Sequence, residues 1–249
     1  MNNCENNKSG FVFPKVFFVA GTDTGVGKTV VSAILAHALS AHYWKPIQSG
    51  IEADSSNPGG TDSKWILQSG IPAERVPSET YVFNQPLSPH LSSRLEGKTI
   101  DLSEIKIPRI EQFSHLIVEG AGGLLVPLND DTKIIDLIAA LKIPVLLVAR
   151  SALGTINHTL LSLEALRARQ IPELGVIMTG KPNYENRRAI EKFGKTTVLA
   201  EVPPLPDFSK ATLLNCFNEQ FLQGKREHEN ERKQDMASVH TDAYCGSST

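Results

Sequence analysis

The chain has 249 residues, of which 41% are hydrophobic and 21% are charged, and its formal net charge is −2 with three cysteines. This composition suits one large globular domain or two small ones, and it offers no basic surface for nucleic acid or an anionic membrane. No segment reaches the roughly 18 apolar residues of a membrane span, and the cysteines are too widely spaced for a zinc site or a disulfide framework, so we expect a soluble cytoplasmic protein.

The first predicted element is a buried strand. Residues 1–14 are expected to form a flexible lead, and Val16–Ala20 is an apolar run of β-branched and aromatic residues. A helix with an apolar face is predicted from Lys28 to about Ala41. The strand and the helix are separated by the glycine-rich stretch Gly21–Thr29.

This glycine-rich stretch is typical of a P-loop. Backbone N–H groups of such a turn point at one spot, at the positive end of a helix dipole, and so bind phosphate. Lys28 would hold the β- and γ-phosphate oxygens, and the Thr29 hydroxyl would hold Mg²⁺. The pattern expects a glycine at Thr22, whereas this chain has it one residue earlier, at Gly21. A turn that binds nothing therefore remains an alternative.

The next elements place a lysine and an aspartate at element ends. His42–Ile47 is predicted as a strand that ends at Pro46, with Lys45 at its carboxyl end, where ligands bind in open α/β sheets. Residues 48–60 are predicted as a loop. A helix then begins after Thr61, a plausible N-cap, with Asp62 in its first turn.

The middle of the chain contains a second acidic strand end. Residues 77–90 are predicted as a loop, and helices are expected over residues 91–96 and over residues 102–113 with a break at Pro108. His115–Glu119 is predicted as a short buried strand that ends in the acid Glu119 and is followed directly by Gly120–Gly123.

The remaining elements alternate regularly. Helices are predicted over residues 134–141, 153–169 and 185–193, and strands over residues 144–149, 175–179 and 196–202. This alternation predicts one α/β domain over residues 15–222, a mostly parallel β-sheet with helices on both faces. Residues 223–249 are almost purely polar and are expected to be a disordered tail.

Lys45, Asp62 and Glu119 fall on the ligand side of such a sheet, beside Lys28 and Thr29 of the P-loop. Lys28 and Lys45 can clamp a transferring phosphoryl group, while Thr29, Asp62 and Glu119 can supply oxygen ligands for Mg²⁺. Each also has a structural alternative: a solvated strand end for Lys45, a helix-start charge for Asp62 and a strand terminator for Glu119.

Five motifs carry a resemblance to a known family. Residues 21–29, 44–50, 88–90, 118–123 and 153–158 resemble the dethiobiotin synthetases, in that family's order, within a region from about Val16 to Leu205. The family's loop begins one residue early, which accounts for Gly21. The resemblance implies a ligase of biotin biosynthesis that uses ATP as co-substrate and Mg²⁺ as cofactor.

The reaction implied is the carboxylation of a diamino acid, 7,8-diaminononanoate. One amine takes up CO₂ as a carbamate, and the carbamate oxygen attacks the γ-phosphate of ATP to form a carbamic-phosphoric anhydride. The second amine then displaces phosphate and closes the ureido ring, which gives dethiobiotin, ADP and phosphate.

The resemblance also assigns site residues. The catalytic residues would be Lys45, Lys28 and Thr24. Nucleotide would be bound by Gly25, Val26, Gly27, Lys28, Thr29, Val30, Asp62, Glu119, Gly120, Ala121, Gly122, Thr179, Gly180, Pro203, Pro204 and Leu205. The diamino acid would be bound by Thr24 and Ser49, and by Leu153, Gly154, Ile156 and Asn157, whose helix N-terminus suits a carboxylate. In the family this last segment comes from a second subunit, so a homodimer is implied.

Two positions depart from the family pattern. Gly25 stands where the family often has an acid, so that side-chain contact is missing. Thr179 stands where an asparagine that reads adenine is expected. Because a hydroxyl reads a base edge less strictly than an amide does, we expect relaxed nucleotide-base choice.

Other classes of protein remain as alternatives. Partition-type and iron-protein-type ATPases share the P-loop but have a second lysine where this chain has Asp23, which argues against them. Glutamine-dependent cobyrinate amidating synthases add a glutaminase domain for which this chain has no room. A non-catalytic nucleotide-binding switch would leave Lys45 and Ser49 without a role.

Overall fold

The computed structural model describes residues 12–51, 60–109 and 115–223. Six strands form one sheet in the order β2-β5-β1-β6-β7-β8, and every pairing in it is parallel. These strands are β1 Val16–Gly21, β2 His42–Trp44, β5 Leu116–Gly123, β6 Val145–Arg150, β7 Glu173–Thr179 and β8 Val198–Val202. The predicted mostly parallel α/β fold is confirmed.

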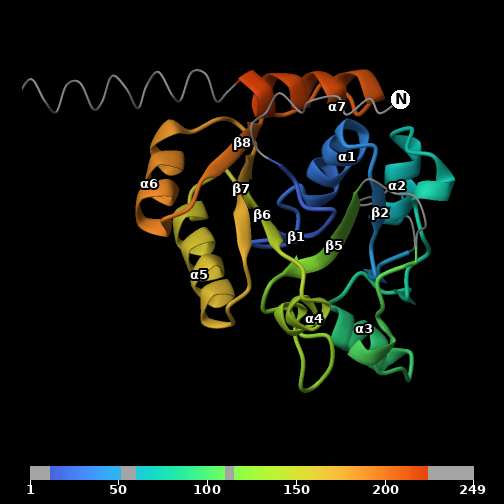
Figure 1. Ribbon diagram of the computed structural model, residues 1–249. Helices are drawn as coiled ribbons and strands as arrows, with labels where there is room; N and C mark the ends of the chain where they lie inside the picture. Colours follow the sequence, from blue (N-terminus) through green and yellow to red (C-terminus); the bar gives the residue numbers. More distant parts are fainter. Residues whose placement is uncertain (1–11, 52–59, 110–114, 224–249) are drawn as a thin grey trace, which may run out of the picture.

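Helices cover both faces of this sheet (Figure 1). On one face lie α1 Lys28–Ala38, α2 Asp62–Gln68 and α7 Lys210–Phe217, which share a core cluster. On the other lie α4 Ile134–Leu141, α5 Thr155–Ala168 and α6 Tyr184–Gly194. A further helix, α3 Pro89–Leu95, contacts β3 Ile47–Ser49 and β4 Tyr81–Phe83. Short 3₁₀ turns occur at Ala73–Arg75 and Leu102–Glu104, and a π turn, Asn218–Gln223, follows α7.

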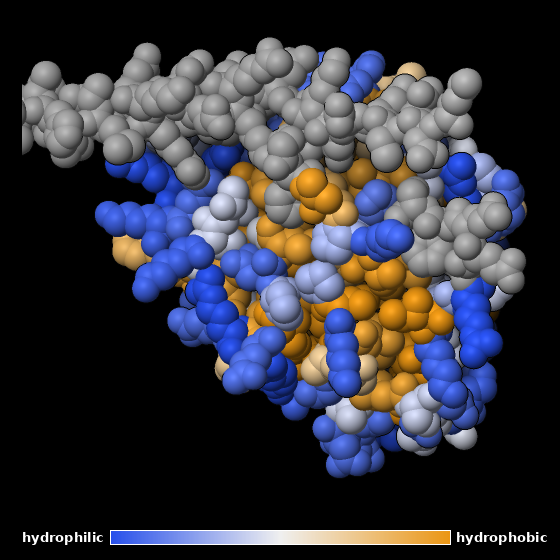
Figure 2. All heavy atoms as spheres, in the orientation of Figure 1, coloured by the Kyte–Doolittle hydropathy of each residue, from blue (hydrophilic) through white to orange (hydrophobic). Residues whose placement is uncertain are grey.

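The central strands explain why the sheet needs two helical layers. Residues Leu146 to Ala149 of β6 are all fully buried, as expected of a parallel strand covered on both faces. Successive residues of β1 pack into different cores, with Phe17 on the α1 face and Phe18 on the α4 face. On the face drawn in Figure 2, apolar side chains occupy the centre and hydrophilic side chains surround them.

The predicted strand over residues 42–47 is wrong in extent. It is divided at Pro46, which has no N–H to donate to a ladder. Its first half is β2, whereas its second half joins β3 Ile47–Ser49, which pairs in parallel with β4 Tyr81–Phe83 in a separate two-stranded sheet. The predicted loop over residues 48–60 therefore contains part of β3. The predicted loop over residues 77–90 contains all of β4 and the first two residues of α3.

The predicted helix over residues 102–113 is also wrong. A single 3₁₀ turn forms, capped by the Asp101 side chain on the Ser103 N–H, and residues 105–109 have no helical structure. Pro108 restricts the preceding residue to extended backbone, which ends any helix there. Residues 110–114 lie outside the described part of the chain.

Strand β5 is longer than predicted, so Glu119 does not end it. The glycines after Glu119 continue the strand to Gly123, which pairs with Gly21 of β1. A side chain at Gly120 would place its Cβ 2.7 Å from the Phe18 ring, so only glycine lets the two strands pack here. Glu119 is consequently held inside the sheet.

Little of the predicted lead and tail is described. Most of the lead over residues 1–14 and of the tail over residues 223–249 lies outside the described residues, so the domain limits of 15 and 222 stay predictions. Within the described residues, none of the helices has the length and apolar character needed to cross a membrane.

Candidate active site

The P-loop connects β1 with α1, as predicted, and three of its glycines have structural causes. Gly25 and Gly27 have positive φ angles of 68° and 87°, a conformation that L-residues rarely adopt. Gly21 lies so close to the loop that a Cβ there would be 2.7 Å from the Asp23 carbonyl oxygen. Glycine is therefore needed at position 21 because the loop backbone approaches it closely. Val30 lies in the first turn of α1.

Lys28 folds back over the same loop. Its Nζ donates to the Asp23 carbonyl oxygen at 3.2 Å. Burial is the main reason that the pKa of Lys28 is lowered to about 8; Lys45 lowers it further, whereas Glu119 and Asp62 oppose the shift. A buried ammonium group with a single neutral partner is well prepared to receive anionic phosphate oxygens.

Two acids and two hydroxyl groups meet beneath the loop. The Thr29 hydroxyl lies 2.9 Å from Glu119 Oε1 and 3.1 Å from Asp62 Oδ1. The Ser32 hydroxyl donates to Glu119 Oε2 at 2.8 Å. Thr29 has only one proton to share between two carboxylates, so the two acids are incompletely satisfied by hydroxyl groups alone.

Lys45 supplies the cation for this cluster. Its Nζ pairs with Asp62 Oδ2 and lies 3.4 Å from Glu119 Oε1, and both Lys45 and Glu119 are buried. Burial by itself lowers the pKa of Lys45, but the two acids outweigh it and the pKa is raised. Burial likewise raises the pKa of Asp62, yet Lys45 and Thr29 hold it below its ordinary value. Lys45 is therefore charged at neutral pH.

The geometry of the cluster follows from element ends. Lys45 comes directly after β2, Glu119 lies in β5 next to it, and Asp62 begins α2, whose N-cap is Thr61. The structure thus brings Lys45, Asp62 and Glu119 together around Thr29.

Two further residues of the cluster were not predicted. Ser32 lies one turn after Thr29 on α1, so both hydroxyl groups face Glu119. Gln48 is buried in β3; its amide nitrogen donates to the Ser49 carbonyl oxygen at 2.8 Å and its amide oxygen accepts from the Asp62 N–H at 3.3 Å. Only the i,i+3 spacing of Ser32 from Thr29 gave a signal in the sequence.

The donor set fits Mg²⁺ rather than a transition metal. One hydroxyl and two carboxylates provide hard oxygen ligands. Among the described residues, no three or more His, Cys, Asp or Glu side chains form a group able to hold a metal ion by themselves. Such a partial shell suits an ion that keeps several waters and shares phosphate oxygens with a nucleotide.

Ser49 and Thr24, the predicted substrate residues, differ in their exposure. The Ser49 hydroxyl is buried and, within the described residues, has no hydrogen-bond partner. Thr24 is exposed at the tip of the P-loop, and a Cβ added at Gly122 would be 3.4 Å from its hydroxyl oxygen. Thr24 therefore lies beside the end of β5, near Ala121 and Gly122.

Thr179 differs from the expectation for a base-reading residue. Its hydroxyl donates to the Val26 carbonyl oxygen of the P-loop at 2.7 Å, and its methyl group packs on Gly27. The single hydroxyl proton is therefore used inside the protein. Gly180 follows Thr179 with a φ of 110°, and residues 203–205 follow β8, which is next to β7 in the sheet.

The predicted carboxylate-binding segment follows the carboxyl end of β6, the strand next to β1. Gly154 has a φ of 92° and caps α5, and Leu153 before it is fully exposed. Ile156 is partly exposed and Asn157 is exposed. Within the described part of one chain, no hydrogen bond or ion pair connects these four residues with Lys45 or Ser49.

Comparisons with known proteins agree on one family. A family model described as an AAA domain matches residues 15–212. The ATP-dependent dethiobiotin synthetase BioD of Agrobacterium fabrum is 47% identical over 206 residues, which cover 82% of this chain and 93% of that protein. The biotin biosynthesis bifunctional protein BioCD of Bordetella avium is 52% identical over 192 residues, which cover 77% of this chain but only 40% of that protein.

Solved structures of similar shape are distant in sequence. The MinC:MinD cell division protein complex of Aquifex aeolicus matches 82% of this chain and 93% of its own chain, with 12% identity and a TM-score of 0.48.

Proposed function

The chain belongs to the ATP-dependent dethiobiotin synthetase family, ligases of biotin biosynthesis, and we propose that Lys28, Thr29, Lys45, Asp62 and Glu119 form the centre at which it makes its C–N bonds. The observation that carries this proposal is the position of Lys45, a buried ammonium group between two acids that also contact the P-loop threonine.

Lys45 and Lys28 provide positive charge where the reaction develops negative charge. The carbamate of 7,8-diaminononanoate is an anion, and its attack on the γ-phosphate of ATP brings two anions together. Fixed ammonium groups in a site of low dielectric lower the cost of this approach, and they require no reorganisation during the reaction. The raised pKa of Lys45 keeps it charged for that task.

Thr29, Asp62 and Glu119 would hold Mg²⁺ together with nucleotide oxygens. When bound, the ion neutralises charge on the phosphate oxygens. Lys45 lies against the same carboxylates in the structure, so it can turn toward the carbamate when another cation compensates the two acids.

Thr24 and Ser49 would orient the amine and carbamate end of the diamino acid. Ring closure is intramolecular, since the second amine belongs to the same molecule as the activated carbamate. Well-oriented intramolecular reactions reach effective molarities of roughly 10⁵–10⁸ M, so positioning can replace a strong catalytic base in this step.

A second copy of the chain would complete the substrate site. Leu153, Gly154, Ile156 and Asn157 would come from that copy and offer the N-terminus of α5 to the carboxylate of the diamino acid. The full exposure of Leu153 supports this arrangement, since a large apolar side chain in that state gains stability when a partner covers it. We place the reaction in the cytoplasm, where ATP is available.

Base selection would be weak at this site. The Thr179 hydroxyl donates to Val26, so it has no proton left for a base edge. We propose that backbone groups near Gly180, Pro203, Pro204 and Leu205 contact the base. Comparable turnover with ATP, CTP and GTP is the expected result, and a strong preference for ATP would contradict it.

The function is tested by incubating the protein with 7,8-diaminononanoate, bicarbonate, Mg²⁺ and ATP. Dethiobiotin and phosphate should form in equal amounts. Lys45→Gln should slow product formation about a hundredfold to a thousandfold while retaining most nucleotide affinity. Lys195→Gln, a change on the opposite edge of the sheet, should leave turnover unchanged. Folded protein that binds ATP without forming product would instead support a nucleotide-binding switch.

A further inference from the structure

The P-loop has an ionic partner outside the reaction centre. Arg150, the last residue of β6, pairs with Asp23 Oδ2 in the first half of the loop. The other carboxylate oxygen, Asp23 Oδ1, accepts the Thr24 N–H at 2.7 Å. The carbonyl oxygen of the same residue accepts Lys28 Nζ at 3.2 Å. Asp23 therefore touches Arg150, Thr24 and Lys28 at once.

The sheet register explains this pairing. In the parallel β1–β6 ladder, Gly21 is opposite Val148, and the Thr22 N–H donates to the Val148 carbonyl oxygen at 2.9 Å. Asp23 and Arg150 each lie two residues further along their own segment and therefore reach the same level. The contact is a direct consequence of β6 being the neighbour of β1.

Asp23 is an acid within a phosphate-binding loop, where an uncompensated carboxylate would repel the phosphates. The side chains of Arg150 and Asp23 are 43% and 48% exposed, so the pair adds little to the stability of the fold. The pair instead affects the charge and the conformation of the loop. It neutralises the only acid of the Gly21–Thr29 segment and fixes the carboxylate that orients Thr24.

We propose that Arg150 is a positioning residue for the P-loop, which acts through Asp23 to neutralise the loop for phosphate and to hold Thr24 and Lys28 in place. The role of Thr24 in this scheme rests on the function proposed above, whereas the effect on nucleotide binding does not.

Three variants test this scheme through the equilibrium binding of the Mg²⁺ complex of the β,γ-imido analogue of ATP. Arg150→Gln leaves the Asp23 carboxylate unpaired, and we expect affinity to fall about tenfold, as one uncompensated charge near the phosphates implies. Asp23→Asn removes the charge but retains an acceptor for the Thr24 N–H, so its loss should be about threefold or less. In the double variant the repulsion is absent, and the affinity should recover to near that of Asp23→Asn.

The recovery in the double variant separates this scheme from two others. If Arg150 contacted the phosphates directly, the double variant would bind as weakly as Arg150→Gln or more weakly, and the proposal would be wrong. If the pair were only structural, melting temperature would fall while affinity stayed constant, which would also overturn it. Arg150→Lys should restore most of the affinity, because it restores the charge next to Asp23.

A matched pair provides the control. Arg169 and Asp136 are similarly exposed and lie 3.3 Å apart, with no contact to the P-loop. Arg169→Gln should leave analogue affinity unchanged. Because the readout is binding, the proposal can be judged even if the protein makes no dethiobiotin, so its failure is distinguishable from failure of the proposed function.

Discussion

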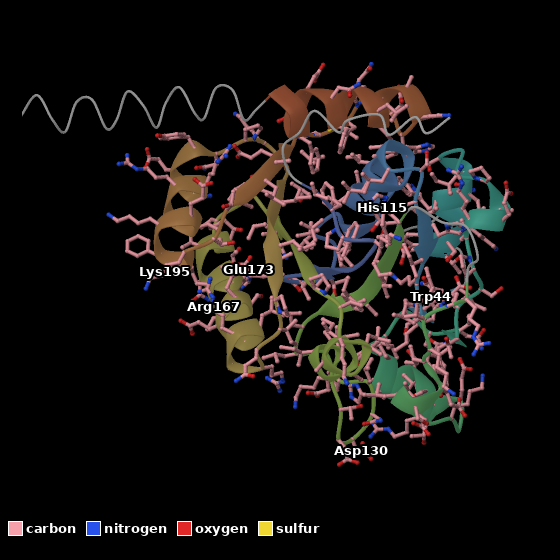
Figure 3. The ribbon with its side chains drawn as sticks, in the orientation of Figure 1. Trp44, His115, Asp130, Arg167, Glu173 and Lys195 are labelled. Carbon is pink, nitrogen blue, oxygen red and sulfur yellow. The ribbon has the colours of Figure 1, made fainter. Side chains whose placement is uncertain are left out.

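Two polar clusters of similar side chains lie at opposite ends of the strands of one sheet. We call these two ends the carboxyl edge and the amino edge of the sheet. At the carboxyl edge, Lys45 pairs with Glu119, with side-chain exposures of 6% and 0%. At the amino edge, Arg167 of α5 lies 3.6 Å from Glu173 of β7, with exposures of 42% and 18%. Figure 3 shows Arg167 and Glu173 together with Lys195, whose carbonyl oxygen also accepts from Arg167.

The difference between these clusters is their contact with water. Each cluster contains a hydroxyl that donates to its glutamate at 2.8 Å, from Ser32 in one and from Thr196 in the other. Water weakens charge interactions at the amino edge, whereas burial preserves them at the carboxyl edge. Similar charged groups can therefore exert a strong electrostatic effect on a substrate only at the buried carboxyl edge.

The largest expected effect comes from removing the buried cation. Lys45→Gln should lower the turnover number about a hundredfold to a thousandfold, the usual cost of losing one preorganised electrostatic group. Arg167→Gln, the matching change at the amino edge, should alter it less than about twofold. Steady-state kinetics at saturating ATP would show the contrast, and equal effects of the two changes would contradict the distinction between the edges.

The second comparison concerns stability. Glu119→Gln leaves Lys45 with one acid in place of two, and breaking a buried charge pair costs about 3 kcal/mol. Glu173→Gln should cost less than about 1 kcal/mol, since its pair is partly solvated. Urea denaturation at pH 7 measures both values. A loss at Glu173 as large as that at Glu119 would show that burial is not the deciding factor.

The two hydroxyl groups offer a finer test. Ser32→Ala removes a hydrogen bond to a charged acceptor at the proposed metal site, and we expect about a tenfold higher Mg²⁺ concentration for half-maximal activity. Thr196→Ala removes a bond of the same length at the amino edge and should leave the Mg²⁺ requirement unchanged. An unchanged requirement in Ser32→Ala would mean that Ser32 does not support the metal ligand Glu119.

The smallest expected effect is a dependence on pH. Because burial lowers the pKa of Lys28 to about 8, the free enzyme loses this charge as pH rises above that value. Nucleotide affinity should be nearly constant below about pH 7, fall about twofold by pH 8 and weaken by about fourfold at pH 8.5. Titrations of ADP from pH 6.5 to 9 would show the decline, and a flat profile would contradict the assignment.

The same shift has a defined consequence for folding. The folded pKa of Lys28 lies below its ordinary value of 10.5. The charged group therefore opposes folding fully below about pH 8, and this opposition disappears as pH rises toward 10.5.

The sequence was sufficient for those features that depend on local pattern. The alternation of elements predicted the parallel sheet. Lys45 and Asp62 lie at the element ends from which they were selected, whereas Glu119 was selected as a strand end and lies inside β5. Ser32 and Gln48 were not found, since their roles depend on partners distant in sequence or on another strand. Thr179 was predicted to face the nucleotide base, but its hydroxyl donates to Val26, which only the packing of β7 against the P-loop reveals.

The errors in the fold have the same origin. The apolar residues at 102–113 suggested a helix, but Pro108 and the Asp101 cap permit only a 3₁₀ turn. The strand was predicted to end at Glu119, yet β5 continues to Gly123, and the missing side chain of Gly120 makes room for the Phe18 ring.

The most direct test of the proposed chemistry is the fate of oxygen from bicarbonate. If the carbamate oxygen attacks the γ-phosphate and the second amine then displaces phosphate, one oxygen atom of the carbamate leaves with that phosphate. Turnover with ¹⁸O-labelled bicarbonate in the presence of 7,8-diaminononanoate, Mg²⁺ and ATP should therefore give phosphate with one labelled oxygen for each dethiobiotin formed. Unlabelled phosphate would mean that water attacks ATP, and it would contradict the account of this site.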